Sequence, residues 1–212
     1  MKLVMLAAVA LVVAGAALAG QAAGARPEAG ADTALVVIDI QNFYFEKGSL
    51  PLTGSVEAAQ QARRVLDAFR SRHLPVIHVR HIPKSVRLTD GEPEDAQYKI
   101  RPEVQPSAGE KVVTKQFANS FRETDLLEYL RGKAIRRLVI VGMQTHMCVE
   151  AASRAAADLG FEVVVLHEAC ATRPLTFGDR VVPAEMVHAT ALAAIDGTYG
   201  KVVSVDAYLK GM

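Results

Sequence analysis

Three residues of types that act together in hydrolysis stand far apart in this sequence: Asp39, Lys115 and Cys148. A thiol, once ionised, is a strong nucleophile toward a carbonyl carbon. A carboxylate can take the thiol proton, and an ammonium group can stabilise the anion that forms. Each residue also has an ordinary interpretation, as a buried apolar thiol, a turn-capping carboxylate or a surface lysine. If the fold brings the three together, they form a set suited to nucleophilic attack by sulfur.

The surroundings of Cys148 indicate where its thiol lies. Residues 137–142 form an apolar, β-branched run that ends at Gly142, and an Ala-rich helical pattern covers 149–159. This pattern is typical of a buried strand, a short turn and a helix. It places the thiol in the first helical turn, where unpaired N–H groups and the helix dipole favour an anion. We therefore expect Cys148 to be ionised at rest.

Asp39 and Lys115 also fall at the ends of expected strands, within or just after apolar runs. Strands are predicted at 34–40, 76–80, 111–114, 137–142, 161–167 and 201–205, and helices at 56–72, 124–131, 149–159 and 183–195. Alternation of this kind predicts a three-layer αβα fold of the Rossmann-like type, with a doubly wound, mainly parallel six-stranded sheet. Sites in such sheets form beyond the carboxyl ends of the strands, so the three residues should meet there.

Residues beside these three are predicted to line a substrate pocket. They are polar or aromatic and lie close to Asp39, Lys115 or Cys148 in sequence, or at the end of the second strand: Gln41, Phe43, Phe45, His81, Phe121 and Thr145. Gln41 would share a side of the strand with Asp39, or would cap a turn. The aromatic rings would form a pocket wall, or would simply pack in the core. Specificity is expected to lie in two segments, 83–106 and 171–182.

The N-terminal residues have the pattern of a signal peptide. Lys2 gives a positive start, residues 3–19 are apolar or glycine, and Ala17-Leu18-Ala19 matches a cleavage site. The alternative is an uncleaved N-terminal membrane anchor. We therefore predict a signal peptide at 1–19, a flexible linker at 20–32 and a folded domain at 33–212. The protein would be exported, periplasmic or secreted, with no stable membrane association after cleavage.

The composition excludes several classes of partner. Lys and Arg total 24 and Asp and Glu total 23, so no nucleic-acid partner is indicated. No glycine-rich phosphate loop occurs, which argues against a nucleotide cofactor. The chain has 2 cysteines, and a Cys148–Cys170 disulfide in an oxidising compartment would silence the nucleophile.

Three segments resemble the isochorismatase-like cysteine hydrolases, including streptothricin-hydrolase-like and nicotinamidase-related amidohydrolases. They are VVIDIQNFYF at 36–45, KQFANSF at 115–121 and VGMQTHMCVEA at 141–151, and the likeness extends over nearly all of 33–208. The resemblance implies that Asp39, Lys115 and Cys148 form a catalytic triad. It also implies a cis peptide between Met143 and Gln144, and an oxyanion hole made by the backbone N–H groups of Gln144 and Cys148.

The resemblance also bears on metals and assembly. Nicotinamidases bind a metal through an aspartate and two histidines after the second strand. Here His78 and His81 are present, but Arg80 stands where an acidic ligand would be sought. No metal and no cofactor are therefore expected. Relatives commonly form symmetric assemblies, so a homodimer or a higher homo-oligomer is expected.

The activity implied is hydrolysis of a C–N bond in a small amide, ureido or lactam-like substrate, through a thioester. One alternative is vinyl-ether hydrolysis of the isochorismatase type, against which the retention of Cys148 and the expected export both argue. Another is a non-catalytic or redox-responsive binding protein on the same fold. Retention of Asp39, Lys115 and Cys148 argues against that alternative.

Overall fold

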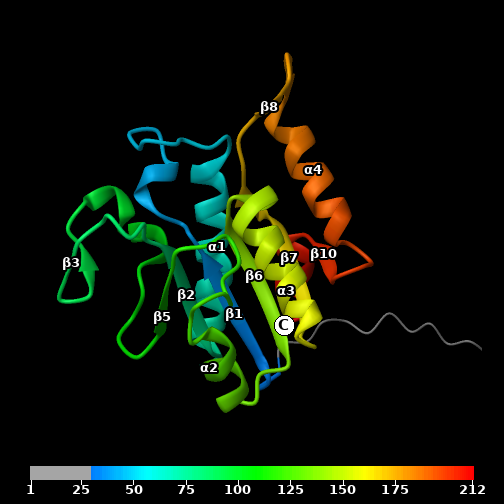
Figure 1. Cartoon of the computed structure of the whole chain (residues 1–212). Helices are drawn as coiled ribbons and strands as arrows, with labels where there is room; N and C mark the ends of the chain where they lie inside the picture. Colours follow the sequence, from blue (N-terminus) through cyan, green and yellow to red (C-terminus); the bar gives the residue numbers. More distant parts are fainter. Residues whose placement is uncertain (1–29) are drawn as a thin grey trace, which may run out of the picture.

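The structure, a computed structural model, describes residues 30–212. The predicted signal peptide and most of the predicted linker lie outside these residues. The centre of the molecule is a 6-stranded sheet in the order β10-β7-β6-β1-β2-β5, in which every pair of neighbours is parallel (Figure 1). Its strands are β1 (Thr33–Ile38), β2 (Val76–His81), β5 (Lys111–Lys115), β6 (Arg137–Met143), β7 (Glu162–Ala171) and β10 (Lys201–Val203). The predicted doubly wound α/β fold is confirmed.

Helices cover both faces of this sheet, which explains why the central strands β1 and β6 are almost entirely apolar and buried. The helices are α1 (Ser55–Ser71), α2 (Leu126–Gly132), α3 (Glu150–Asp158), α4 (Ala184–Ile195) and α5 (Val205–Lys210). In β1, Leu35 and Val37 pack toward α1 and α5, whereas Val36 and Ile38 pack toward α2, α3 and α4. Successive strand residues point to opposite faces, so every residue of β1 is buried.

The apolar stripe of α1 anchors one layer. Ala62, Val65 and Phe69 recur at helical spacing and are fully buried against the sheet. Burying a phenylalanine side chain stabilises the fold by about 2–3 kcal/mol. On the solvent side, Arg63 pairs with Asp67 one turn later, at 2.7 Å. Within residues 30–212, no helix combines the length and the apolar character needed to cross a bilayer.

The end of β6 approaches β1 unusually closely. Gly142 has a φ of 137°, and a Cβ atom there would lie 2.0 Å from the carbonyl oxygen of Ile38. Only glycine avoids that clash and tolerates the backbone angle. The approach brings the segment after β6 beside the segment after β1, and these are the segments that hold Cys148 and Asp39.

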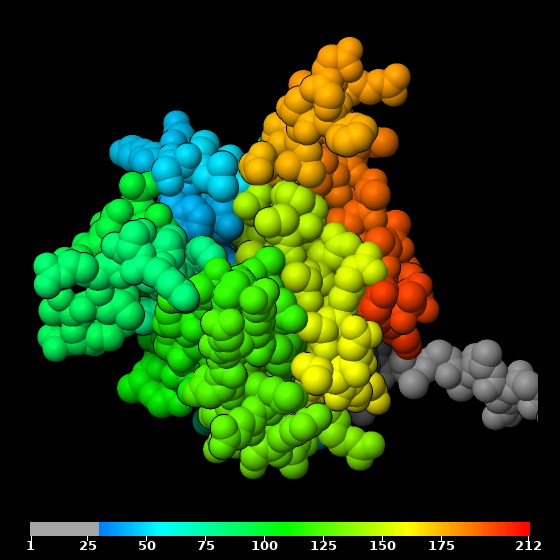
Figure 2. Space-filling model, in the orientation of Figure 1, coloured from blue at the N-terminus to red at the C-terminus, as the bar shows by residue number. Residues whose placement is uncertain are grey.

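Several loops contain more regular structure than predicted. Strand β7 continues to Ala171, and a hairpin of β8 (Leu175–Phe177) and β9 (Arg180–Val182) follows it, so the loop predicted after 167 was wrong. The 83–106 segment holds a small hairpin, β3 (Leu88–Thr89) and β4 (Glu92–Pro93), with 3-10 turns at Ala96–Tyr98 and Pro102–Val104. Helix α5, which was not predicted, is capped by the Ser204 side chain. The β8–β9 hairpin projects from the body beside α4 (Figure 2).

Candidate active site

Asp39, Lys115 and Cys148 meet at the carboxyl ends of three strands, as their positions predicted. Asp39 follows β1, Lys115 is the last residue of β5, and Cys148 lies in a π-helical turn, Thr145–Val149, between β6 and α3. The Lys115 Nζ atom lies 2.7 Å from Asp39 Oδ2 and 3.3 Å from Cys148 Sγ. The ammonium group therefore bridges the carboxylate and the sulfur.

Burial makes this cluster unusual for charged groups. The side chains of Asp39 and Lys115 are fully buried, whereas Cys148 keeps 7% of its surface exposed. Although burial alone would lower the pKa of Lys115, the Asp39 charge and the neighbouring sulfur raise it above its ordinary value. Lys115 is thus held as an ammonium ion. Asp39 Oδ1 has no hydrogen-bond partner within residues 30–212, which leaves it free to accept a proton.

The protonation of Cys148 differs from the expectation. Burial, together with the charge of Asp39, raises the pKa of the thiol to about 12, against the opposing effect of Lys115. The expectation of a resting thiolate was therefore wrong, because desolvation and a neighbouring carboxylate outweigh the ammonium group and the helical turn. At neutral pH the proton rests on sulfur and has to leave during attack, with Asp39 as the nearby acceptor.

The turn before Cys148 has the backbone that the resemblance implied. The peptide between Met143 and Gln144 is cis. The N–H groups of Met147 and Val149 both donate to the Gln144 carbonyl oxygen, at 3.0 and 3.2 Å. The Cys148 N–H lies between these two in the same turn. Its role with the Gln144 N–H as an oxyanion hole stays a prediction.

Gln41 does not line a pocket. Its side-chain amide donates to the carbonyl oxygens of His81 and Tyr98, at 3.1 and 2.6 Å, and accepts the His81 N–H at 2.8 Å. Gln41 is completely buried, and these backbone contacts use both ends of its amide. Gln41 therefore joins the end of β2 to the 83–106 segment.

The three predicted aromatic residues make packing contacts, and Phe45 also lines a cavity of about 760 Å³ together with Asn42, Ile100 and Arg101. Phe43 is buried with its ring 4.0 Å from that of Tyr44 and 5.4 Å from that of Tyr98. Phe45 packs under the guanidinium of Arg101, at 4.3 Å. Phe121 stacks on Phe161, which immediately precedes β7, at the opposite end of that strand from the triad. The structure therefore does not bring Phe121 to the site.

His81 and Thr145 do lie beside the triad. His81 pairs with Lys115 across β2 and β5, and burial together with the Lys115 charge lowers the pKa of His81. Its Nδ1 atom is buried without a partner in the described part of the chain. Thr145 is completely buried, and its hydroxyl group lies 2.9 Å from His188 Nδ1.

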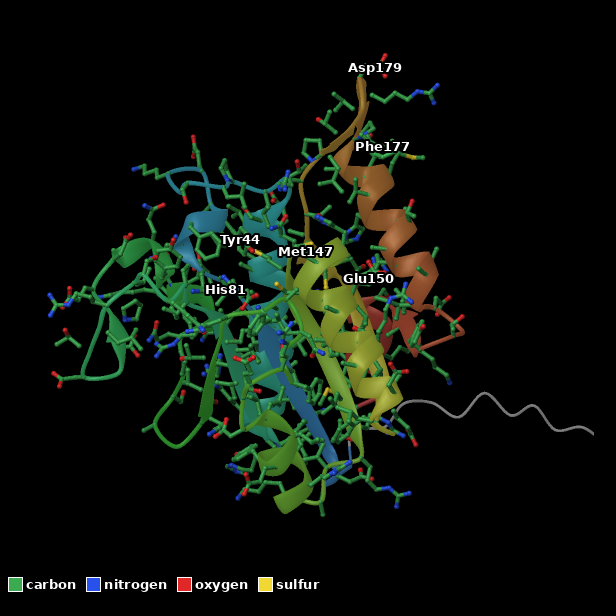
Figure 3. The ribbon with its side chains drawn as sticks, in the orientation of Figure 1. Tyr44, His81, Met147, Glu150, Phe177 and Asp179 are labelled. Carbon is green, nitrogen blue, oxygen red and sulfur yellow. The ribbon has the colours of Figure 1, made fainter. Side chains whose placement is uncertain are left out.

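Two residues near the thiol were missed by the sequence reasoning. The Tyr44 hydroxyl accepts a hydrogen bond from the Gln144 side chain at 3.3 Å, and burial together with the Asp39 and Cys148 charges raises its pKa. Tyr44, His81 and Met147 gather at the same end of the sheet (Figure 3). Arg173 follows the extended end of β7, and its charge acts on both Tyr44 and His146. The Arg173 Nε atom is buried and has no hydrogen-bond partner within residues 30–212.

The remaining predicted features of the site concern metal and redox chemistry. His78 Nε2 lies 2.8 Å from Glu110 Oε2, away from His81, and no group of three metal-ligating side chains is found in the described residues. Both cysteines are free thiols. Cys170 lies beside Gly142 in the sheet, with its Sγ atom 3.4 Å from the Leu166 carbonyl oxygen.

Most of the chain matches known proteins. Residues 33–207 match the model of the isochorismatase domain. The chain belongs to the isochorismatase family. It is therefore a hydrolase of that family, and the resemblance seen in the sequence is confirmed.

Three matches within the family illustrate the range of the likeness. An uncharacterized isochorismatase family protein from Bacillus subtilis is 41% identical over 178 residues, covering 84% of this chain and 99% of that one. A maleamate amidohydrolase from Pseudomonas putida is 30% identical over 198 residues, covering 85% and 87%. The crystal structure of a putative isochorismatase hydrolase from Oleispira antarctica superposes with a TM-score of 0.79 at 45% identity, covering 84% and 96%.

Proposed function

We propose that this hydrolase cleaves the C–N bond of a small amide through a thioester on Cys148, with a carboxylate on the substrate held by Arg173. The observation that carries the proposal is the triad geometry, in which Lys115 Nζ lies 2.7 Å from Asp39 and 3.3 Å from the sulfur. A buried carboxylate, ammonium and thiol at these distances suit sulfur attack on a carbonyl group. The amidohydrolase among the relatives supports the same reaction class.

The first half of the reaction forms the thioester. Asp39 accepts the Cys148 proton as the sulfur attacks the carbonyl carbon. Lys115 stabilises the negative charge as it moves from the Asp39 carboxylate to the Cys148 sulfur. The carbonyl π electrons move onto oxygen, which accepts hydrogen bonds from the N–H groups of Gln144 and Cys148. The C–N bond then breaks, and Asp39 returns its proton to the departing nitrogen, which leaves as ammonia or an amine.

The second half releases the acid. Asp39, now ionised again, takes a proton from a water molecule that attacks the thioester carbon. The carbon–sulfur bond breaks, and the proton held by Asp39 restores the Cys148 thiol. The high pKa of the thiol fits this cycle, because Asp39 carries the thiol proton to the leaving nitrogen and later carries a proton from water back to the sulfur.

Arg173 supports an anionic substrate. Its guanidinium group is half-buried and acts electrostatically on Tyr44 and His146, which border the thiol. The Arg173 Nε atom is buried and has no hydrogen-bond partner within residues 30–212, so it keeps hydrogen-bonding capacity for a ligand. Guanidinium groups bind carboxylates through two parallel hydrogen bonds. The maleamate of the Pseudomonas relative is itself an amide that bears a carboxylate.

The test compares ammonia release from a four-carbon amide acid, succinamate, with that from the uncharged butyramide. A charge-assisted hydrogen bond contributes about 1.5–3 kcal/mol, so Arg173→Met should lower kcat/KM for succinamate by about 10- to 100-fold. Turnover of butyramide should change by less than about threefold, since it has no group for Arg173 to bind. Equal loss on both substrates, or a preference of the native enzyme for butyramide, would contradict the anionic assignment.

Export and self-association complete the proposal. The apolar run at 3–19 and the Ala17-Leu18-Ala19 site support secretion through a cleaved signal peptide. N-terminal sequencing of the protein recovered outside the cytoplasm should begin at or soon after Gly20. The family resemblance supports a homodimer or higher homo-oligomer, which light scattering of the purified protein measures directly.

A further inference from the structure

The turn that holds the nucleophile is tied to a helix distant in sequence. Thr145 opens the π-helical turn Thr145–Val149 and is completely buried. Its Oγ1 atom lies 2.9 Å from Nδ1 of His188, which projects from α4. Helix α4 stands beside α3 and covers this end of the turn (Figure 1).

The position of Thr145 gives this contact a consequence for chemistry. The N–H groups of Gln144 and Cys148 are the ones assigned to the oxyanion. Thr145 directly follows Gln144 and lies three residues before Cys148. A π-helical turn has an unusual backbone, and such turns are frequent at functional sites. The hydrogen bond between Thr145, the first residue of the turn, and His188 on a separate helix limits how far the backbone of the turn can shift.

A second pair, buried to a similar degree, holds the same turn. His146 Nδ1 lies 2.5 Å from the hydroxyl oxygen of Thr172, at the end of β7. In both pairs the threonine is buried and the histidine is half-buried. The Thr145–His188 pair differs in position: it holds the first residue of the turn, which directly follows Gln144.

We propose that His188 is a positioning residue that, through Thr145, fixes the Gln144 and Cys148 N–H groups in the orientation that binds the oxyanion. This inference rests on the proposed function. Burial, together with the nearby His167, lowers the pKa of His188, so the ring is neutral at pH 7. A neutral ring with its proton on Nε2 accepts a hydrogen bond from the Thr145 hydroxyl group at Nδ1.

The shape of histidine supplies matched variants. In His188→Asn, an amide atom occupies about the place of Nδ1 and can still bond Thr145. In His188→Gln, the polar atoms lie about where Nε2 was, out of reach of the hydroxyl group. Both variants have neutral amides of similar polarity, so they differ mainly in this contact. Thr145→Val removes the partner instead and keeps the side-chain shape.

The first measurement is steady-state amide hydrolysis. Removing one oxyanion donor costs about 100- to 1,000-fold in kcat, and a displaced donor costs less. We therefore expect His188→Gln and Thr145→Val to lower kcat by about 10- to 100-fold with KM changed less than about threefold, and His188→Asn to stay within about threefold of native. The double variant Thr145→Val/His188→Gln should be no slower than either single variant, because both remove one interaction.

The second measurement does not require amide turnover. Butyraldehyde can add to Cys148 as a thiohemiacetal, whose oxyanion occupies the same hole, so its binding reports hole geometry directly. Its affinity should fall about 10-fold or more in His188→Gln and stay near native in His188→Asn. Equal behaviour of these two variants, or a loss confined to KM, would overturn the positioning role. Failure of the native enzyme to hydrolyse any amide would instead refute the proposed function, and the aldehyde series would still decide the role of His188.

Discussion

Replacing Asp39 with asparagine is expected to make Cys148 more reactive toward alkylation while abolishing turnover. The substitution removes the carboxylate charge that raises the thiol pKa and leaves the Lys115 ammonium 3.3 Å from the sulfur. Asparagine is among the few residues that tolerate the left-handed backbone at position 39, where φ is 51°. The backbone should therefore stay in place.

The expected size of the effect follows from the Lys115–Cys148 distance. At 3.3 Å and an effective dielectric constant of about 20, an ammonium and a thiolate attract each other by about 5 kcal/mol. Asp39, 2.7 Å from the same ammonium group, offsets much of that attraction in the native chain. If Asp39→Asn restores about half of the attraction between Lys115 and the thiolate, the pKa of the thiol falls by about two from about 12. The thiolate fraction at pH 7 then rises about 100-fold.

The assay measures the rate of iodoacetamide modification between pH 6 and 9 in a Cys170→Ala background, so that only the Cys148 thiol is modified. Asp39→Asn should be modified about 100-fold faster than its parent at pH 7. Ammonia release should fall about 100- to 10,000-fold because the base is gone. Lys115→Gln is the matched control: it removes the group that lowers the thiol pKa, so alkylation should slow. Unchanged or slower alkylation of a folded Asp39→Asn variant would refute the electrostatic reasoning.

Two further predictions concern stability. Gly142→Ala should lower the free energy of unfolding by more than about 3 kcal/mol in urea titrations, because its Cβ would meet the Ile38 carbonyl oxygen at 2.0 Å. Gly54→Ala, at φ 72° with no atom within 4 Å, is the control and should cost only about 1 kcal/mol. Although burial opposes it, hydrogen bonds led by that from Arg70 lower the pKa of Glu110 from 4.5 to about 2. Because the folded-state pKa is the lower one, this stabilisation is present above pH 4.5 and is lost as pH falls toward 2. In urea titrations at each pH, the native free energy of unfolding should fall between pH 5 and 3 by about 2 kcal/mol more than that of Glu110→Gln, which lacks the titrating carboxyl group.

The sequence was sufficient to predict the sheet and the three central residues. Apolar runs buried on both faces mark parallel strands, and Asp39, Lys115 and Cys148 each lie at the end of one. Their meeting follows from topology and needs no knowledge of the loops. The order of elements therefore predicted the fold class and the meeting of these three side chains.

The residues around the thiol were harder to predict because they lie where strand alternation ends. After Ile38 the chain turns at Asp39 and then forms the 3-10 turn Asn42–Tyr44, which directs Tyr44 toward Gln144 and leaves Phe43 in the core. Arg173 acts electrostatically on Tyr44 because β7 extends to Ala171, in a stretch whose Glu168 interrupts the apolar pattern.

The protonation state of the thiol could not be read from the sequence either. Helix position favours the thiolate, but burial and the distance to a carboxylate decide the outcome, and both are properties of the folded chain. The tie from Thr145 to His188 was equally hidden, since 43 residues separate its two ends.

The central claim is that the Cys148 sulfur attacks the substrate, and ammonia release from succinamate by two cysteine variants tests it most directly. Cys148→Ala should lose activity by at least about 10,000-fold, whereas Cys170→Ala, which removes the other thiol, should stay within about threefold of native. Ammonia release by a folded Cys148→Ala variant at a rate close to native would contradict the account.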